Sequence, residues 1–150
     1  MPLSHHIEIT NPDNILSSGE SLGYDWLVIN NGIGFRCGYV LIPHGHPWFE
    51  FGCDDITPRP EVHGGLTYAN YGASGGSGEL KKDMSEWLIG FDCAHAGDAP
   101  DPSLERRNTT RFPEEYFRIM GHANSIRSTE YVESELGHLC TQVFIAGLGV

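Results

Sequence analysis

The chain has 150 residues, of which 39% are hydrophobic and 11% aromatic, enough to bury the core of one ordinary globular domain. Its formal charge of −11 at pH 7 argues against long nucleic acid as a partner, because that function rewards a positive surface. No apolar run approaches the roughly 20 residues needed to span a bilayer, and the first residues lack the pattern of a signal peptide. We therefore expect one cytoplasmic domain, residues 1–150, without a membrane as partner.

Residues 26–42 predict a β-hairpin. Residues 26–29 and 35–42 are apolar runs typical of buried strands, and Asn30-Asn31-Gly32 between them tolerates the positive φ of a tight turn. Pro43 should end the second strand, because proline cannot donate to a β-ladder. Residues 1–24 precede this first strong element, and we expect them to form a peripheral N-terminal segment.

The rest of the chain predicts two more strands and a C-terminal helix. Residues 66–71 and 86–91 have strand character, and loops rich in glycine and proline precede each of them. The tail then changes to a helical period, with apolar residues at Val132, Leu136, Leu139, Cys140 and Val143. Ser128 is a suitable N-cap with Glu130 in the first turn, and a shorter helix is expected over 113–120.

These elements predict an α+β fold, with an antiparallel sheet of about four strands and a C-terminal amphipathic helix packed on one face. The four cysteines show no Cys-x-x-Cys pair, so a zinc-finger or thioredoxin-like site has no support. We expect buried free thiols at Cys37, Cys53, Cys93 and Cys140.

Three polar clusters stand at the ends of the predicted strands. They are His44-Gly45-His46, His63-Gly64-Gly65, and the run from Asp92 to Asp98 that also holds Cys93 and His95. Functional side chains are often held at the rim of a rigid sheet. In an antiparallel meander the three clusters could converge on one rim.

One interpretation of these clusters is a divalent metal site. Histidines two apart in an extended chain point to one face, and a carboxylate from elsewhere completes the ligand set, here His44, His46 and Asp98. Such an ion could lower the pKa of a bound water and hydrolyse a phosphoester or amide.

A second interpretation is acid–base catalysis without metal. His63 or His95 could act as general base or acid near neutral pH, with Asp92 or Asp98 orienting the imidazole. The candidate catalytic residues in this case are His63, Asp92 and His95.

A third interpretation is the binding of a small polar ligand. Five of the nine basic residues, all arginine, fall within residues 106–127, and a guanidinium suits carboxylate or phosphate. Stacking could come from the aromatic residues Tyr39, Trp48, Phe49, Tyr68, Tyr71 and Trp87. The candidate ligand-binding residues are His63, Thr67, Asp92, His95, Asp98, Arg106 and Arg111.

Four segments resemble a group of small proteins encoded by bacteriophages and prophages. They are Arg36-Cys37-Gly38-Tyr39-Val40, His46-Pro47, Val62-His63-Gly64-Gly65-Leu66-Thr67, and the nine residues from Gly90 to Asp98. The similarity spans roughly residues 35–145. The resemblance implies a viral source, the host cytosol as location and an accessory role, such as countering host defence by sequestering or cleaving a nucleotide signal.

Three hypotheses follow. The leading one is a phage-type protein that binds a small polar, nucleotide-derived ligand at the sheet rim. The alternative is a metal-dependent or His/Asp hydrolase acting on a phosphoester with the same residues. The third is an acidic protein inhibitor of a host factor. A homo-oligomer is compatible with all three.

Overall fold

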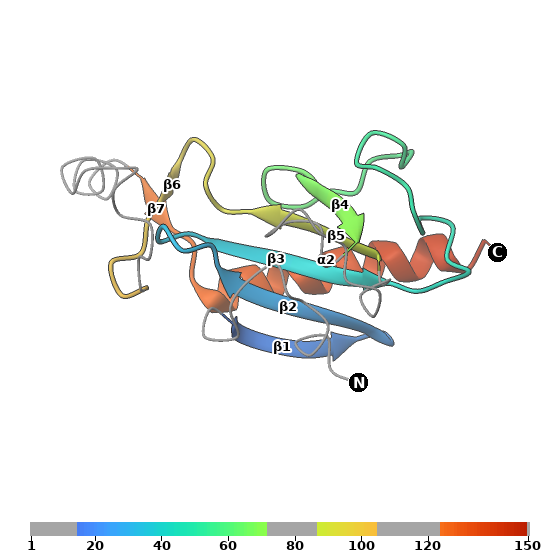
Figure 1. The fold of residues 1–150 in the computed structure, drawn as a ribbon, viewed down its shortest axis with the longest axis horizontal. Coiled ribbons are helices and arrows are strands. Elements are labelled where there is room, and N and C mark those ends of the chain that lie inside the picture. The colour runs from blue at the N-terminus through green and yellow to red at the C-terminus, as the bar shows by residue number, and fades with distance from the viewer. Residues whose placement is uncertain (1–14, 72–86, 105–123, 150) are drawn as a thin grey trace.

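The computed structural model describes residues 15–71, 87–104 and 124–149. Its centre is a five-stranded antiparallel sheet of order β1-β2-β3-β5-β4, with one long helix packed on one face (Figure 1). The strands are β1 Ile15–Ser21, β2 Tyr24–Asn30, β3 Arg36–Ile42, β4 Tyr68–Tyr71 and β5 Trp87–Asp92, and the helix is α2 Thr129–Gly147. A short parallel pair, β6 Asp98–Ala99 and β7 Ser125–Ile126, lies beyond the start of β3. The predicted α+β architecture is confirmed.

The predicted hairpin is formed by β2 and β3. Trp26 pairs with Val40 at one end and Asn30 with Arg36 at the other. In the turn, the backbone N–H of Asn31 donates to the carbonyl of Phe35 at 2.9 Å, and Gly32 has a φ of +90°. Here the turn residues of the sequence specify the structure directly.

The N-terminal segment is not wholly peripheral, because residues 15–21 form the edge strand β1. Ser18 pairs with Leu27 and Glu20 with Asp25 on β2. The sequence did not reveal this strand because Ile15–Ser21 is mostly serine, glycine and glutamate, and the stretch from Ser18 to Glu20 is exposed. An edge strand can be this polar because only one of its sides pairs with the sheet.

The last two strands do not continue a meander. β5 lies between β3 and β4, with Cys37 opposite Asp92 and Tyr68 opposite Gly90. Residues Trp87-Leu88-Ile89-Gly90-Phe91 are all buried, as expected of a strand covered on both faces. β4 is half-buried and takes the edge instead. The more apolar strand occupies the central position.

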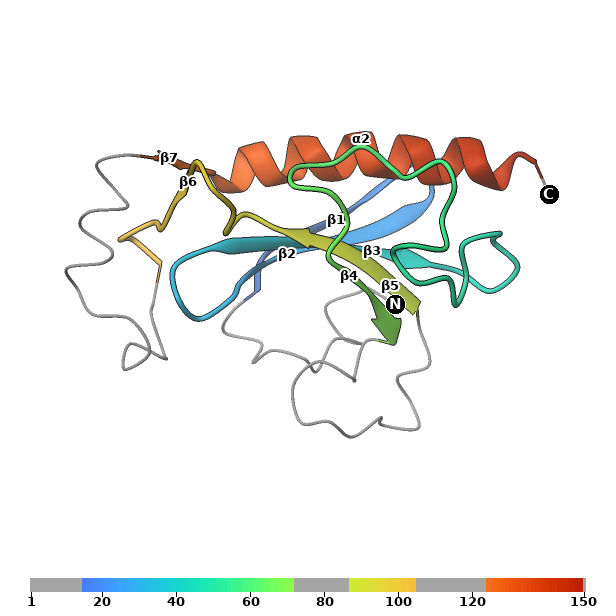
Figure 2. The same cartoon turned by 90° about the horizontal axis from the view of Figure 1, so that it is seen from above.

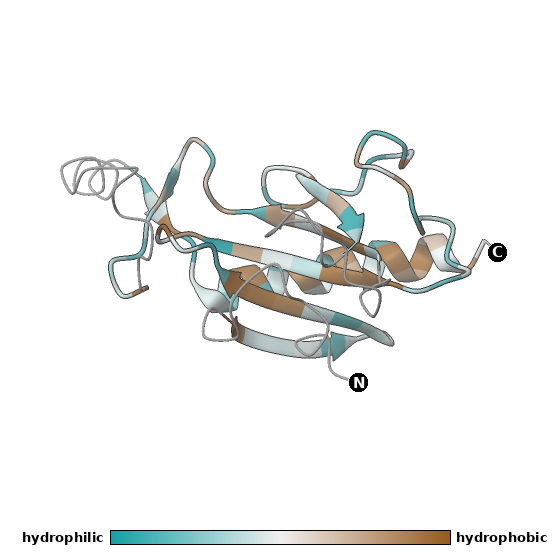
Figure 3. Cartoon of the chain, in the orientation of Figure 1, coloured by the Kyte–Doolittle hydropathy of each residue, from teal (hydrophilic) through white to brown (hydrophobic). Residues whose placement is uncertain are grey.

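The helix α2 packs its apolar stripe against the sheet. The five residues of the predicted stripe are all fully buried: Val132, Leu136, Leu139, Cys140 and Val143. Ser128 is the N-cap, and its hydroxyl accepts from the backbone N–H of Tyr131 at 3.1 Å. Apolar residues concentrate on β2, β3, β5 and α2 (Figure 3). The predicted helix over 113–120 lies outside the described residues.

A long loop, residues 43–67, runs beside α2 from its C-terminal half toward its first turn (Figure 2). The His46 Nε2 atom lies 2.8 Å from the carbonyl oxygen of Val143. The side-chain amide of Gln142 accepts from the backbone N–H of Glu61 at 2.7 Å and donates to the carbonyl of Glu61 at 2.8 Å. These contacts place His63 beside the beginning of the helix.

Three of the four cysteines are buried, Cys37, Cys93 and Cys140, and Cys53 is partly exposed. All four are free thiols. Over the described ranges, no helix combines the length and apolar character that crossing a bilayer requires.

Candidate functional site

The strand register decides which of the three polar clusters meet. Because Cys37 pairs with Asp92 and Tyr68 with Gly90, the end of β5 lies beside the starts of β3 and β4. Ile42 pairs with Trp87, so the end of β3 lies at the opposite rim. The clusters around His63 and from Asp92 to Asp98 therefore share a rim, and the His44–His46 cluster lies away from them.

Asp98 is the centre of the shared rim. It lies on β6, whose parallel pairing with β7 places Asp98 opposite Ser125 and close to Arg127. Its side chain is 1% exposed. Oδ1 accepts from Arg127 Nε at 2.8 Å, while Oδ2 lies 2.8 Å from His63 Nε2 and accepts from the His95 backbone N–H at 3.0 Å. A buried carboxylate with three donors is a well-satisfied anion.

These donors determine the charge of Asp98. Burial raises the pKa of its carboxyl, but the hydrogen bonds from Arg127 and His63 outweigh burial and lower the pKa below its ordinary value. Asp98 is therefore ionised at neutral pH. Since an ionised carboxylate has no proton to donate, His63 Nε2 must carry the hydrogen of the 2.8 Å contact.

The other nitrogen of His63 faces a hydroxyl. Nδ1 lies 2.7 Å from the Tyr131 hydroxyl oxygen on the first turn of α2. With Nε2 protonated, a neutral His63 accepts from the hydroxyl at Nδ1, and a protonated His63 donates to it. Burial and the Glu135 carboxylate raise the pKa of Tyr131, while Arg127 over its ring opposes them. The Tyr131 hydroxyl thus keeps its proton at neutral pH.

A buried arginine fixes the backbone around the row of contacts from Asp98 through His63 to Tyr131. Arg36, at the start of β3, donates from three nitrogens, at 2.9 Å each, to Asp101 Oδ2, the Arg127 carbonyl and Thr129 Oγ1. It joins the segment after β6 to the start of α2. Asp98 and Tyr131 consequently hold their places through contacts that do not involve His63.

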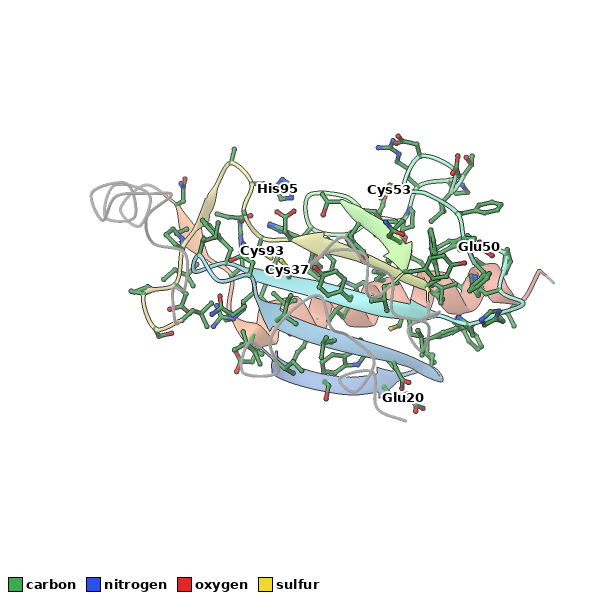
Figure 4. The ribbon with its side chains drawn as sticks, in the orientation of Figure 1. Glu20, Cys37, Glu50, Cys53, Cys93 and His95 are labelled. Carbon is green, nitrogen blue, oxygen red and sulfur yellow. The ribbon has the colours of Figure 1, made fainter. Side chains whose placement is uncertain are left out.

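A second imidazole lies beside the first. The ring centroids of His63 and His95 are 6.1 Å apart. His95 Nε2 is 3.2 Å from Asp92 Oδ1 and is buried, without a hydrogen bond of acceptable geometry. Asp92 accepts from Thr67 Oγ1 at 3.1 Å and from the Ala94 backbone N–H at 3.0 Å. Figure 4 shows His95 on the outer side of Cys93, away from the sheet.

The His95 ring lies against Gly64. A Cβ atom at Gly64 would stand 2.3 Å from His95 Nε2, and the backbone φ there is +69°. Both features require glycine. Gly64 therefore allows the second imidazole to approach the loop that carries the first.

A pocket of about 520 Å³ opens next to His63. It lies between the loop and α2, and its lining consists of Glu61, Val62, His63, Glu135, His138, Thr141 and Gln142. Small-molecule sites have volumes of this order. Two carboxylates at the wall make it a poor place for a group with several negative charges.

The structure does not bring together the three predicted metal ligands. Both ring nitrogens of His46 have partners, Nε2 at the carbonyl oxygen of Val143 and Nδ1 at the backbone N–H of Trp48. His44 stacks on Phe49 with ring centroids 4.2 Å apart. Asp98 lies at the other rim. Across residues 15–71, 87–104 and 124–149, no three His, Cys, Asp or Glu side chains are grouped so as to hold a metal ion.

The remaining predicted ligand-binding residues divide in two. Contacts connect five of them into one cluster: His63, Thr67, Asp92, His95 and Asp98. Arg106 and Arg111 lie outside the described residues.

In the described part of the chain, the candidate aromatic residues make contacts in separate places. Tyr39 packs edge-on against Tyr68, and Tyr71 packs edge-on against Trp87. Trp48 borders a separate apolar groove near the end of α2.

Sequence reasoning did not identify Tyr131 or Arg36 as site residues. Tyr131 lies one position before the buried Val132 and reads as a helix-surface aromatic, while Arg36 reads as the first residue of a strand. Their roles follow from contacts between distant segments, of Tyr131 with His63 and of Arg36 with Asp101, Arg127 and Thr129. No protein-family model, curated protein or solved structure matches the chain.

Proposed function

We propose that this chain is a metal-independent hydrolase that acts on a small polar molecule at the rim formed by β5, β6 and the start of α2. The observation that carries the proposal is the line from Asp98 through His63 to the Tyr131 hydroxyl, with contacts of 2.8 and 2.7 Å. A carboxylate that orients an imidazole, which in turn meets a hydroxyl, is the arrangement used for proton transfer in many enzymes.

Each member of the line has a distinct role. Asp98, ionised and almost fully buried, fixes the tautomer and the orientation of the His63 ring through the 2.8 Å contact with Nε2. His63 accepts or releases a proton at Nδ1. Tyr131 passes that proton between His63 and a molecule bound at the rim, and its raised pKa keeps the hydroxyl neutral before and after transfer.

Model esters test this proposal. We expect the wild-type protein to hydrolyse at least one of 4-nitrophenyl acetate, 4-nitrophenyl phosphate and bis(4-nitrophenyl) phosphate, with no loss of rate in EDTA. His63→Gln should lower the rate by about 100-fold or more, because a general acid–base group contributes that much. His44→Gln is the control, since His44 lies at the opposite rim and is exposed. Equal rates for His63→Gln and His44→Gln would refute the catalytic role.

A second candidate function is binding without turnover of a nucleotide-derived ligand. Arg127 supports it, because Nε is bound to Asp98 while neither Nη atom has a partner among the described residues. A guanidinium edge of this kind suits one phosphate oxygen pair. Native mass spectrometry separates the two functions, since a binder returns its ligand intact after denaturation and a hydrolase releases products.

The accessory role implied by the phage resemblance could be served by either function. Sequestering a nucleotide signal requires only the binding site, and destroying it requires the proton-transfer line. An acidic inhibitor of a host factor, the third hypothesis, is supported by the charge of −11. It would keep its effect in the His63→Gln variant, in contrast to the hydrolase.

A further inference from the structure

We infer that His95, which lies beside Asp92 and against Gly64, is a second acid–base group of the same site, and that the substrate class is a phosphodiester. This inference rests on the proposed hydrolase function and deepens it. It starts from the pairing of two imidazoles, each with its own carboxylate, on adjacent loops.

Each of the two imidazoles lies beside a different carboxylate, and Asp98 connects the pairs because it also accepts from the His95 backbone N–H. His63 is bound to Asp98 of β6, and His95 lies 3.2 Å from Asp92 at the end of β5. The imidazole centroids are 6.1 Å apart and their planes are tilted by 56°. The two histidine–carboxylate pairs therefore lie close enough together to act on one bound molecule.

The free nitrogen of His95 is Nδ1. Nε2 is enclosed by Gly64 and Asp92, and Nδ1 has no hydrogen-bond partner in the part of the chain that the structure describes. The His95 side chain is 35% exposed, whereas that of His63 is 13% exposed. His95 can exchange a proton with a ligand directly, while His63 does so through Tyr131.

Two such groups fit displacement at phosphorus better than acyl transfer. In an in-line displacement the attacking and leaving oxygens lie on opposite sides of phosphorus, so one group cannot serve both. In acyl transfer one imidazole serves both oxygens in turn. A second imidazole with its own carboxylate is needed only in the first case.

The step balances without a further reactant. His95 Nδ1 takes a proton from water as the water oxygen forms a bond to phosphorus. The bond from phosphorus to the leaving oxygen breaks, and that oxygen takes the Tyr131 proton while protonated His63 replaces it from Nδ1. The products are a phosphomonoester and an alcohol. The two imidazoles end in exchanged protonation states, which solvent resets.

The local charges favour a diester over a monoester. Arg127 is the cation at the centre, and Asp98 already neutralises it. Asp92 lies beside His95, and Glu61 and Glu135 line the adjoining pocket. A diester carries one negative charge and a monoester close to two at neutral pH, so the monoester meets more repulsion.

Gly64 is the positioning residue for His95. An alanine there would place its Cβ 2.3 Å from Nε2 and would force the imidazole away. Gly65 supplies a matched control, because its φ of +79° is equally unusual but a Cβ there would meet nothing within 4 Å. The two alanine variants carry the same kind of backbone strain and differ in the contact with His95.

The test uses bis(4-nitrophenyl) phosphate with the full chain and its His95→Gln, Gly64→Ala and Gly65→Ala variants. We expect a decrease in kcat/KM of about 100-fold for His95→Gln and for Gly64→Ala. Gly65→Ala should stay within about threefold of the wild type. Thermal unfolding of each variant checks that the fold is retained.

The pH profile gives a readout that a structural role would not move. The wild-type profile should be bell-shaped, and His95→Gln should lose its acidic limb, because His95 acts as the base. The charged groups that face His95 are Asp92 on β5, Asp98 on β6 and His63 on the loop.

The outcomes separate the two proposals. If no model ester is hydrolysed, or if His63→Gln is fully active, the proposed function itself fails. If His63→Gln is inactive while His95→Gln retains both rate and bell-shaped profile, only the inference fails. A preference for 4-nitrophenyl acetate over the diester would also overturn the inference.

Discussion

His63 Nδ1 and the Tyr131 hydroxyl oxygen lie 2.7 Å apart although 68 positions separate the two residues in the chain. One belongs to an irregular loop and the other to the first turn of α2. The loop is fixed by Gln142, and the start of the helix is fixed by Arg36 and by the Ser128 cap. Because each side is anchored separately, single substitutions in the site can be tested in a folded protein.

Asp98→Asn should destabilise the protein by about 2–4 kcal/mol. The amide keeps the size of the carboxylate but turns one donor toward either His63 or Arg127, which leaves a buried donor without an acceptor. Urea denaturation measures the change. Asp92→Asn is the control, because Asp92 is about one-third exposed. This variant should lose less than about 1 kcal/mol of unfolding free energy. Equal losses for the two variants would contradict the central role of Asp98.

The Asp98 contribution should disappear in acid. Its pKa is lowered in the folded state below the ordinary value of 3.8, so folding favours the ionised form. The stabilisation is fully present from about one pH unit above the unfolded pKa of 3.8. It is lost as the pH falls through the lower pKa of the folded state. The difference in unfolding free energy between the wild type and Asp98→Asn should therefore shrink below about pH 4. A difference that stayed constant from pH 6 to pH 2.5 would show that folding does not lower the pKa of this carboxyl.

Arg36→Ala should cost about 2–4 kcal/mol of unfolding free energy. The Arg36 side chain is 9% exposed and makes three hydrogen bonds. Removing it leaves Asp101 Oδ2 and the Arg127 carbonyl without the donor that Arg36 supplies. Arg59→Ala provides the comparison, since Arg59 pairs with Asp54 on the surface and should change stability by less than about 0.5 kcal/mol. Denaturant curves with unchanged slopes for both variants would make the comparison valid.

Gly137→Ala should stabilise the protein by about 0.5–1 kcal/mol. Gly137 lies inside α2, and an added Cβ would meet nothing within 4 Å, so alanine brings its higher helix propensity without a clash. Gly90→Ala should act in the opposite direction, because a Cβ on β5 would stand 2.5 Å from Tyr39 Cδ1 and 2.6 Å from the Gly38 carbonyl oxygen. The midpoint of thermal unfolding should rise for the first variant and fall for the second.

Alkylation should distinguish Cys53 from the other thiols. Burial raises the pKa of Cys37 and Cys93 to about 12 and that of Cys140 to about 11, so these thiols are neither accessible nor ionised at pH 8. Iodoacetamide should add one group to the native protein, at Cys53, and four in denaturant, as counted by mass spectrometry. Modification of Cys93 in the native protein at the Cys53 rate would indicate that the rim opens readily.

The sequence predicts the parts of the fold that follow from local periodicity. The β2–β3 hairpin and the stripe of α2 are correct because the turn residues and the spacing of apolar residues act over a few positions. β1 and the order of β4 and β5 are not accessible in this way. Polar Ile15–Ser21 becomes a strand only because β2 offers it a partner, and β5 takes the centre because both of its faces are covered.

The candidate site was predictable by residue type but not by partner. His63, Asp92, His95 and Asp98 stand out as polar side chains at strand ends, and the structure connects them. Which carboxylate serves which histidine depends on β6 and β7, two strands of two residues each with no periodic signal. His46 differs from these residues. It was predicted as a metal ligand from its spacing to His44, but its side chain instead holds the loop against α2.

The loop over residues 43–67 is attached to α2 at two points, and the helix fixes the distance between them. It is attached near the C-terminal half of the helix at Gln142 and Val143 and at the first turn at Tyr131, about three turns away. Inserting one residue in α2 between Tyr131 and Gln142 would rotate one attachment point by about 100° relative to the other and shift it by about 1.5 Å. The number of residues between Tyr131 and Gln142 is therefore constrained by the contacts that the loop makes at both ends of this segment.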